Sequence, residues 1–112
     1  LHVPLSKSTQ GMIGRHELSA MRAGSMLVNT SRGEVIDEHA TATSVVHGHL
    51  AGVGVDVLAG ESEAGFDPRQ SPLVRAQRDG FNVIVTPHIG GWTDSATAHT
   101  RAALVTRVLE AL

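Results

Sequence analysis

The sequence predicts an α/β fold built on a parallel sheet. Three short and almost continuously apolar segments, residues 26–28, 53–57 and 83–85, have the composition of buried strands. Segments with helical patterns or with many Gly and Pro residues separate them. Strands that are apolar throughout are typical of parallel sheets with helices on both faces. We therefore expect a parallel sheet that is covered on both faces.

Length and composition indicate a single globular domain. The chain has 112 residues, of which 41% are hydrophobic and 18% charged, and its formal net charge is −2. This balance argues against nucleic acid or an anionic membrane as a partner. Cysteine is absent, which excludes disulfides, a thiolate nucleophile and Cys-based zinc sites. No bilayer-spanning stretch or signal-peptide pattern is present, so we expect a cytoplasmic protein.

The first third of the chain should contain one helix and one strand. Residues 1–5 suggest the end of a strand that runs into a loop, because Pro4 cannot donate a hydrogen bond to a sheet. Residues 11–21 carry a short helical pattern, which Gly24 closes. The apolar run 26–28 is then the first complete strand and ends at Asn29.

The middle third should contain one helix, one strand and a long loop. Asp37 is a suitable N-cap for a helix to about Val46, and Gly48 suits the position just past its end, although Thr-rich sequences favour helices less than Leu or Ala. The strand at residues 53–57 follows. Residues 58–81 are rich in Gly, Pro and charge, which predicts a loop with at most one helical turn, near Leu73.

The last segment has the periodicity of a helix, capped by Thr93 or Asp94. Its stripe consists of Ala96, Thr100, Ala103, Leu104, Val108, Ala111 and Leu112.

A polar group follows each predicted strand. Arg32 comes after the first strand, Asp56 and Glu61 after the second, and His88 after the third. Because the carboxyl ends of parallel strands meet at one edge of the sheet, we expect these side chains to converge. Arginine can bind a carboxylate through two hydrogen bonds, and histidine can move a proton near neutral pH. A carboxylate beside the histidine orients the ring and stabilises the imidazolium.

Small residues in the same turns suggest a flat cofactor. Gly33, Gly90 and Gly91 allow the backbone to approach such a molecule without an intervening Cβ atom. Together with the arginine and the histidine–carboxylate pair, they predict redox chemistry on a small carboxylic acid.

Each of these residues also has a structural explanation. Arg32 could be a surface side chain, and Asp56 could cap the end of its strand. Glu63 competes with Glu61 as the partner of the histidine, and either could be a solvated loop charge. His88, which follows a proline, could be buried and satisfied by backbone groups.

The His47-Gly48-His49 segment invites a metal interpretation. Its spacing fits no standard zinc motif and no Cys or acidic ligand lies nearby in the sequence, so an exposed loop is the expected structure. No metal site is predicted.

Four segments, in order, resemble the consecutive motifs of the D-isomer-specific 2-hydroxyacid dehydrogenases. They are LHVPLS at residues 1–6, NTSRGEVIDE at 29–38, GHLAGVGVDV at 48–57 and TPHIGG at 86–91. Residues 71–91 are most similar to phosphoglycerate-dehydrogenase-like members. The resemblance implies the C-terminal half of a Rossmann-type doubly wound parallel sheet, so that residues 1–112 form part of an NAD(P)-binding domain.

The resemblance also implies a function. Such a protein would be an oxidoreductase that transfers a hydride between NAD, or alternatively NADP, and a small D-2-hydroxy acid or 2-keto acid, as a homodimer. In this family pattern Arg32 would hold the substrate carboxylate and carbonyl, His88 would be the acid–base group, and Glu61 would pair with His88. The residues implied at the cofactor are His2, Pro4, Thr30, Ser31, Arg32, Asp56, His88 and Gly91. Asp56 would bind the nicotinamide carboxamide, and His2 and Pro4 would lie near the adenosine.

The chain departs from the family pattern in two ways that matter for function. Ser62 follows Glu61 where the family usually has proline, which predicts a less constrained loop. No G-x-G-x-x-G motif occurs, so we expect the pyrophosphate-binding half and the substrate domain to be absent and the isolated chain to be inactive. Two alternatives stay open: an NAD-binding sensor or corepressor-like module, and a self-associating inactive fragment with uncovered sheet surfaces.

Overall fold

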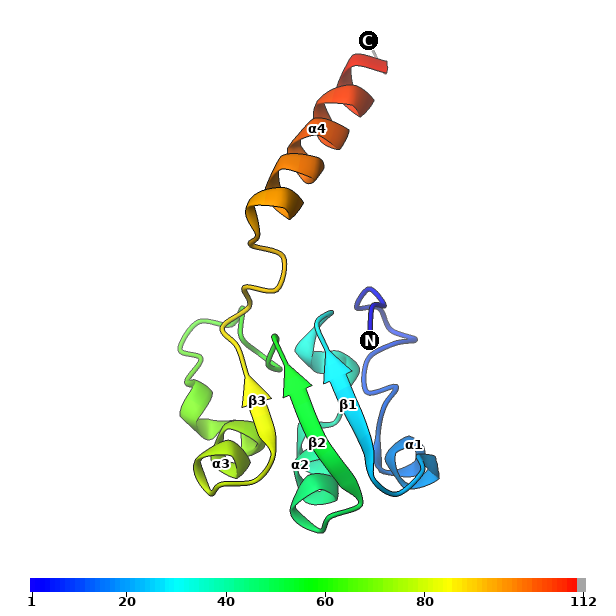
Figure 1. The fold of residues 1–112 in the computed structure, drawn as a ribbon, viewed down its shortest axis with the longest axis vertical. Helices are drawn as coiled ribbons and strands as arrows, with labels where there is room; N and C mark the ends of the chain where they lie inside the picture. The colour runs from blue at the N-terminus through cyan, green and yellow to red at the C-terminus, as the bar shows by residue number, and fades with distance from the viewer. Residues whose placement is uncertain (111–112) are drawn as a thin grey trace.

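The computed structural model describes residues 1–110, which form a three-stranded parallel sheet, three helices packed along it, and a fourth helix that stands apart (Figure 1). The strands are β1 (Ser25–Asn29), β2 (Leu50–Val55) and β3 (Val83–Val85), in the spatial order β1-β2-β3. The helices are α1 (Arg15–Ala20), α2 (Glu38–Val46), α3 (Pro72–Arg78) and α4 (Asp94–Glu110), with short 3-10 helices η1 (Gly33–Val35) and η2 (Pro68–Gln70). The predicted α/β class is confirmed.

The register of the sheet aligns the carboxyl ends of its strands. Asn29 pairs with Val55, and Val55 pairs with Val85, so the last residues of all three strands lie in one row. The chain therefore leaves every strand at the same level of the sheet. This geometry brings the turns after the strands together, as the strand-end argument expected.

Helix α2 forms as the sequence predicted. The Asp37 side chain caps it by accepting a 2.9 Å hydrogen bond from the Ala40 N–H. The Thr41 and Thr43 hydroxyls donate to the carbonyls of Asp37 and His39, at 2.7 and 2.8 Å, so neither hydroxyl is left without a partner. The helix is thus compatible with the threonines in its interior.

Three local expectations are wrong. No strand is assigned at residues 1–5; instead the amino group of Leu1 donates to the Val28 carbonyl at 2.6 Å, which places this segment beside β1. Strand β2 begins and ends earlier than residues 53–57. The segment 58–81 contains the seven-residue helix α3 and η2 rather than a loop with one helical turn. Helix α3 is a normally capped helix, because Ser71 accepts a hydrogen bond from the Leu73 N–H and a proline occupies its first turn.

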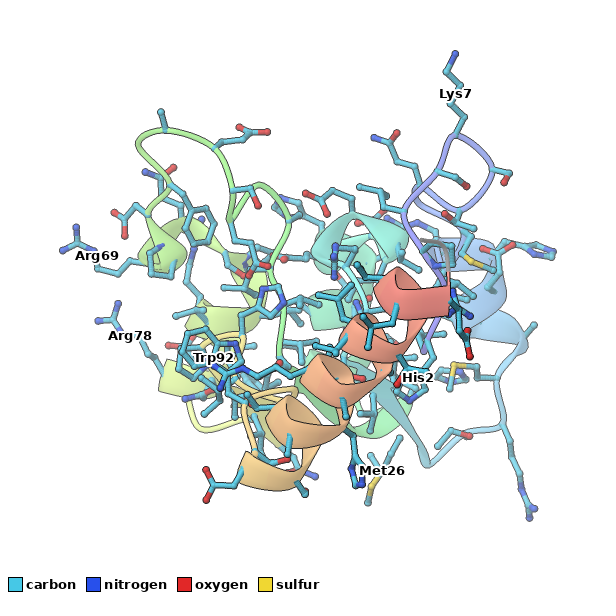
Figure 2. All side chains as sticks on the ribbon, turned by 90° about the horizontal axis from the view of Figure 1, so that it is seen from above. His2, Lys7, Met26, Arg69, Arg78 and Trp92 are labelled. Atoms are coloured by element: carbon cyan, nitrogen blue, oxygen red, sulfur yellow. The ribbon has the colours of Figure 1, made fainter. Side chains whose placement is uncertain are left out.

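Helices cover only one face of the sheet. Leu27, Val55 and Val83 point into a core shared with α2 and α3. Met26, Val28 and Ile84, on the other face, are 70%, 55% and 63% exposed. Figure 2 shows Met26 projecting from the ribbon. Within residues 1–110, the expectation of a sheet covered on both faces is therefore wrong; one apolar face is exposed, and self-association through it stays a prediction.

Helix α4 is the predicted last helix, and it has no buried residue in its described length. Of the two proposed caps, Thr93 is the one whose hydroxyl accepts a hydrogen bond, from the Ala96 N–H at 3.1 Å. Ala111 and Leu112 of the predicted stripe lie outside the described residues. Figure 1 shows α4 extending away from the carboxyl edge of the sheet.

Candidate active site

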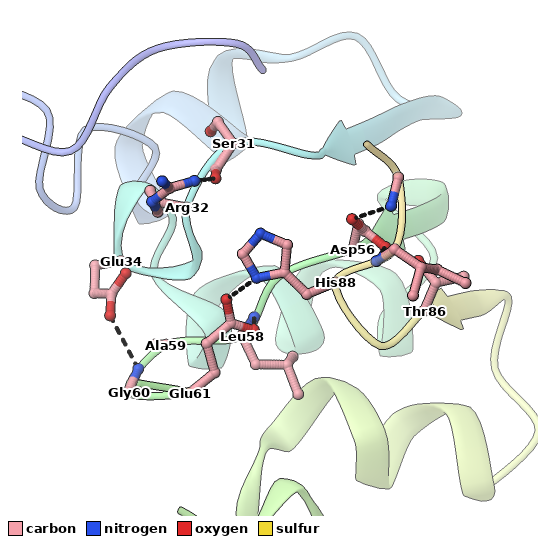
Figure 3. A network of polar contacts seen from close by, with 12 residues as sticks. Ser31, Arg32, Glu34, Asp56, Leu58, Ala59, Gly60, Glu61, Thr86 and His88 are labelled. Carbon is pink, nitrogen blue, oxygen red and sulfur yellow. Dashed lines mark hydrogen bonds and ion pairs between the residues drawn. The ribbon is translucent and has the colours of Figure 1, made fainter. Parts of the chain in front are cut away.

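A histidine and a carboxylate meet at the carboxyl edge of the sheet. His88 Nδ1, from the turn after β3, lies 2.5 Å from Glu61 Oε1, from the segment after β2. The His88 side chain is half exposed and that of Glu61 is mostly buried, so the histidine is not the buried, backbone-satisfied residue of the structural alternative. Figure 3 shows the second ring nitrogen of His88 turned away from Glu61 and toward the side on which Arg32 lies.

Glu61, and not Glu63, is the partner of the histidine. A second bond fixes its carboxylate, because Glu61 Oε2 accepts the Leu58 N–H at 3.1 Å. The Glu61 N–H in turn donates to the Leu58 carbonyl at 3.3 Å. The Glu61 carboxylate therefore caps its own turn through Oε2 and contacts His88 through Oε1.

His88 has an uncommon backbone conformation. Its φ of +53° is the only positive value at a non-glycine residue in the described chain. The His88 N–H donates to the Thr86 carbonyl at 3.0 Å, across Pro87. A non-glycine residue held in this region indicates a backbone fixed by its surroundings at a candidate functional position.

Asp56 provides that fixation. Its Oδ1 accepts the Thr86 hydroxyl at 2.5 Å and the Ile89 N–H at 3.0 Å, and its Oδ2 accepts the Gly90 N–H at 2.8 Å. A Cβ at Gly90 would lie only 2.8 Å from Asp56 Oδ2, so a larger residue there would displace the Asp56 carboxylate. Asp56 thus holds both sides of the turn that carries His88.

The pKa of Asp56 reflects this environment. Burial of the side chain opposes ionisation, but the hydrogen bonds from Thr86, Gly90 and Ile89, with the nearby His88, favour the carboxylate more strongly. The pKa of Asp56 consequently lies below its ordinary value of 3.8.

Arg32 lies at the end of a turn that Asn29 organises. Asn29 is fully buried; its Nδ2 donates to the Arg32 carbonyl at 2.8 Å, and its Oδ1 accepts the Ser31 N–H and hydroxyl at 3.1 and 2.8 Å. The Arg32 side chain is exposed and uses Nη1 to donate to the Ser31 carbonyl at 2.7 Å. This bond orients the guanidinium, and Arg32 has no other side-chain hydrogen bond to residues 1–110.

The turns after β1 and β2 interlock at Gly33. A Cβ at Gly33 would lie 2.1 Å from the Leu58 carbonyl carbon and 2.2 Å from the Ala59 nitrogen, so only glycine fits. The two turns are also joined by hydrogen bonds from the Ala59 N–H to Glu38 and from the Gly60 N–H to Glu34. The structure thereby ties the segment that carries Glu61 to the turn that carries Arg32 (Figure 3).

The remaining predicted site residues lie around this edge with different exposure. Thr30 and Gly91 are exposed, and a Cβ at Gly91 would meet open space. Ser31 is 9% exposed, and its side chain serves the Asn29 turn. His2 and Pro4 are exposed beside β1, and among the described residues neither is hydrogen-bonded to Arg32, Glu61 or His88.

Three residues that the sequence analysis did not single out are central to the geometry: Asn29, Glu38 and Thr86. Asn29 and Thr86 lie within the recognised motifs and directly follow or end strands, which was the available signal. Glu38 is the last residue of the motif at residues 29–38, but its contact with Ala59 forms only in the tertiary fold, so the motif marked the position without indicating its partner.

A groove of about 440 Å³ adjoins the histidine–glutamate pair. Its lining residues come from the two segments that carry the pair and from the loop before α3: Leu58, Glu61, Ser62, Phe66, Pro68, Val85, Thr86, Pro87 and His88. The groove combines apolar walls with the polar pair at one side, which is the usual character of a small-molecule site.

Other site types find no support among residues 1–110. No group of three or more His, Cys, Asp or Glu side chains there could hold a metal ion. His47 is exposed, and a ring nitrogen of each of the two histidines, Nδ1 of His47 and Nε2 of His49, contacts a backbone carbonyl, at 2.8 and 3.0 Å. The described helices include none that is both long and apolar enough to cross a bilayer.

Comparison with known proteins assigns the chain to a family. Residues 1–90 match the model of the D-isomer specific 2-hydroxyacid dehydrogenase, NAD binding domain. The chain is 45% identical over 96 residues to the D-3-phosphoglycerate dehydrogenase of Escherichia coli K12, covering 86% of this chain and 22% of that protein. It is 38% identical over 112 residues to the hydroxypyruvate reductase of Thermotoga maritima, covering all of this chain and 35% of that protein.

The fold agrees with this assignment. The D-lactate dehydrogenase of Aquifex aeolicus, solved with NAD and lactic acid, superposes with a TM-score of 0.76 at 32% identity, over 96% of this chain and 34% of that one. The chain thus spans about a third or less of the relatives that it matches. By sequence and by fold, this chain belongs to the D-isomer-specific 2-hydroxyacid dehydrogenase family, and residues 1–90 match the Rossmann-type NAD-binding domain of that family.

Proposed function

We propose that this chain carries the acid–base half of an active site that transfers a hydride between NAD and a small D-2-hydroxy acid or 2-keto acid. The observation that carries the proposal is the contact of 2.5 Å between His88 Nδ1 and Glu61 Oε1 at the carboxyl edge of the sheet. A histidine whose Nδ1 is held by a carboxylate presents its other nitrogen for proton transfer.

In the reductive direction, His88 donates the proton. NAD, when bound in its reduced form, supplies the hydride to the carbonyl carbon of the 2-keto acid. The protonated His88 gives its Nε2 proton to the carbonyl oxygen, and the product is the 2-hydroxy acid. Glu61 stabilises the imidazolium before the transfer and orients the ring throughout. In the oxidative direction His88 takes the proton back.

Arg32 is the proposed substrate anchor. Its Nη1 is engaged with the Ser31 carbonyl, which orients the guanidinium and leaves the remaining N–H groups for a carboxylate and an adjacent carbonyl oxygen. The substrate would thereby be fixed relative to the His88 ring, and such positioning lowers the barrier to reaction.

Of the residues proposed to bind the cofactor, only some leave room for a flat ring at the carboxyl edge of the sheet. Thr30 and Gly91 are exposed, and the space beyond Gly91 is open, which suits a nicotinamide. Both Asp56 oxygens already accept bonds from the chain, so Asp56 would act on the carboxamide while holding the His88 turn. His2 and Pro4 are the candidates for the adenosine end.

We further propose that the pyrophosphate-binding turn and the substrate domain belong to sequence beyond these 112 residues, in a homodimeric enzyme. On this proposal the isolated chain binds NAD(H) weakly and has no measurable hydride transfer, because transition-state binding requires both reactants to be held. Calorimetric titration of the chain with NADH, and an absorbance assay of NADH oxidation with hydroxypyruvate, test this directly. Turnover by the isolated chain would overturn this part of the proposal.

The residue roles are best tested in a chimera. The corresponding 96-residue segment of the E. coli D-3-phosphoglycerate dehydrogenase is replaced by the segment of this chain. We expect the chimera to oxidise D-3-phosphoglycerate with NAD. His88→Ala should lower kcat by about 10²- to 10⁴-fold, which is the usual contribution of a general acid–base group. Glu63→Gln, in the same loop, is the matched control and should leave kcat unchanged.

Two outcomes would contradict these roles. A chimera that folds and binds NADH but keeps its kcat in the His88→Ala variant would exclude the acid–base role. A chimera that binds NADH and turns over no 2-hydroxy or 2-keto acid would favour a sensor module on the same fold.

A further inference from the structure

The turn that carries Glu61 is held by carboxylates from another part of the chain. Three successive backbone N–H groups donate to three different glutamates: Leu58 to Glu61 Oε2 at 3.1 Å, Ala59 to Glu38 Oε1 at 2.8 Å and Gly60 to Glu34 Oε1 at 3.0 Å. Two of these glutamates lie in the crossover between β1 and β2. The position of the turn thus depends on residues more than 20 positions away in sequence.

Glu38 is a buried side chain whose two carboxylate oxygens bind two different segments of the chain. It is 9% exposed, and its second oxygen accepts the Ser71 hydroxyl at 2.6 Å. Ser71 caps α3, so one carboxylate connects the start of α2, the turn at Ala59 and the start of α3. A buried carboxylate with both oxygens hydrogen-bonded is geometrically constrained, and charge-assisted bonds of this kind are stronger than neutral ones.

Glu34, whose side chain is partly exposed, binds the same turn at Gly60. It belongs to η1, directly after Gly33, whose missing side chain lets the backbone at Leu58 and Ala59 approach. The Glu34–Gly60 bond closes the turn on the side nearer to Glu61. Figure 3 shows Glu34 reaching the Gly60 nitrogen, with Glu61 on the same loop directed toward His88.

The segment directly after Glu61 lacks the restraint that a proline would give. Ser62 follows Glu61 where the family pattern has proline, so the fixed φ of a pyrrolidine ring is absent. Residues 62–65 are exposed and contribute no buried apolar anchor. The bonds from the Ala59 and Gly60 N–H groups therefore restrain the turn from its amino-terminal side, together with the buried Leu58 side chain.

We propose that Glu34 and Glu38 are positioning residues, which hold the Glu61 turn so that Glu61 Oε1 reaches His88 Nδ1. They do not touch the reacting atoms; they act through Glu61. What the pair does in catalysis rests on the proposed function, whereas the positioning itself is a property of the chain alone.

The first experiment is NMR spectroscopy of the 112-residue chain, with Glu34→Ala, Glu38→Ala and the double variant. We expect faster hydrogen exchange of the Ala59 and Gly60 amides in the variants. We also expect the ¹⁵N resonance of His88 Nδ1 to move toward its position in Glu61→Ala, furthest in the double variant. Glu34→Gln and Glu38→Gln should restore the wild-type spectrum, since the carboxamide keeps an acceptor oxygen. Glu63→Ala is the control, and it should leave these signals unchanged.

The result that overturns the proposal is an unchanged His88 Nδ1 resonance in a folded double variant. Sheet amides of β2 report whether the variant is folded. If loss of Glu38 unfolds the chain, Glu34→Ala decides alone, because Glu34 is partly exposed and its bond is at the surface of the turn.

A kinetic readout separates positioning from general stability. In the chimera, Glu34→Ala and Glu38→Ala should lower kcat by about 10- to 100-fold, the scale seen when outer-shell partners are removed, with a smaller change in KM. If the wild-type chimera is inactive but the variants of the 112-residue chain show the expected NMR changes, the proposed function is excluded and the positioning role stands. An active chimera whose kcat is the same in both variants, with unchanged NMR signals, would remove the positioning role alone.

Discussion

Asp56 shows how one side chain can serve both stability and the candidate chemistry. Its two oxygens accept three hydrogen bonds from the residues on either side of His88. These bonds join Asp56, which follows β2, to the turn after β3, so its structural role is to hold that turn and not to cap its own strand; the cofactor role stays a proposal. The hydrogen bonds from Thr86, Ile89 and Gly90 favour the ionised form of the Asp56 side chain over its protonated form.

The first prediction concerns Asp56→Asn. The pKa of Asp56 is lowered in the folded state, so the carboxylate stabilises the fold above the ordinary value of 3.8, and this contribution is lost as the pH falls through the folded pKa. Near neutral pH the variant should lose about 1–3 kcal/mol of unfolding free energy, the usual cost of removing a charged acceptor from buried donors. Urea titrations at neutral pH and below pH 3.8 measure the difference, which should shrink in acid. A difference independent of pH would contradict the assignment.

The sequence predicted the site at the level of strand ends and missed its support. Arg32, Glu61 and His88 were expected to converge because polar residues that follow parallel strands lie at one edge, and the shared row of strand ends places the turns that carry them at that edge, where His88 contacts Glu61. The bonds of Glu34 and Glu38 join segments that lie apart in sequence, and no local pattern encodes such contacts. Whether each residue has its proposed role stays a prediction.

At the scale of elements, contacts between the turns that follow the strands set the geometry of the candidate site. Gly33 lies where two crossovers touch, and its absent side chain sets how closely they approach. Gly90 has the same function against Asp56, whereas the backbone at Gly91 faces open space. The glycines that were expected to accommodate a cofactor thus differ: Gly33 is required by the neighbouring backbone, Gly90 leaves room for the Asp56 carboxylate, and the cofactor role of Gly91 stays a prediction.

Gly33→Ala provides the second prediction. Its Cβ would overlap the backbone at Leu58 and Ala59, and backbone cannot rotate away as a side chain can. We expect a loss of about 1–3 kcal/mol, the usual cost of overpacking, together with a displaced Glu61 turn. Thermal unfolding and the His88 spectrum measure the two effects. Gly91→Ala is the matched control, and equal losses in both variants would count against the steric explanation.

Helix α3 shows why an element can be missed although its signals are present. Ser71 is a good N-cap, Pro72 a favourable first residue, and Gly80 a normal position past the end, with φ of +89°. Residues 58–81 are rich in Gly, Pro and charged residues, and the prediction of a loop rested on this composition and not on the helix-capping residues. By contrast, α2 was predicted from Asp37 as its N-cap and Gly48 just past its end, because the run between them contains no Gly or Pro.

At the scale of the whole molecule, the chain exposes more surface than its size requires. Its accessible area is 7676 Å², against roughly 5,900 Å² for a compact monomer of this mass. Its radius of gyration is 16.3 Å, against about 13 Å for a compact domain. Helix α4 and the open sheet face account for the excess, which has the size of a protein–protein interface.

The third prediction follows from that surface. Leu104, Val105, Val108 and Leu109 lie on α4 with exposures between 52% and 68%. We expect the isolated chain to self-associate, with this stripe and the open sheet face buried between copies. Sedimentation velocity over a concentration series should show species above the monomer mass of 11.8 kDa.

A pair of α4 variants tests the surface. Val105→Lys with Leu109→Lys should weaken self-association at least about tenfold, because charged residues would be buried without partners. Thr106→Lys, on the polar side of the same helix, should have little effect. A wild-type chain that stays monomeric at high concentration would exclude the prediction.

The backbone at His88 has a consequence for protein engineering. Its φ of +53° is a conformation that glycine adopts without steric cost, whereas a residue with a Cβ atom is strained there. In a library selected only for heat resistance, we therefore expect glycine to become more frequent at position 88 at the expense of the imidazole. On the proposed function, engineering for stability must keep His88 constant, because the same substitution would remove the proposed proton donor.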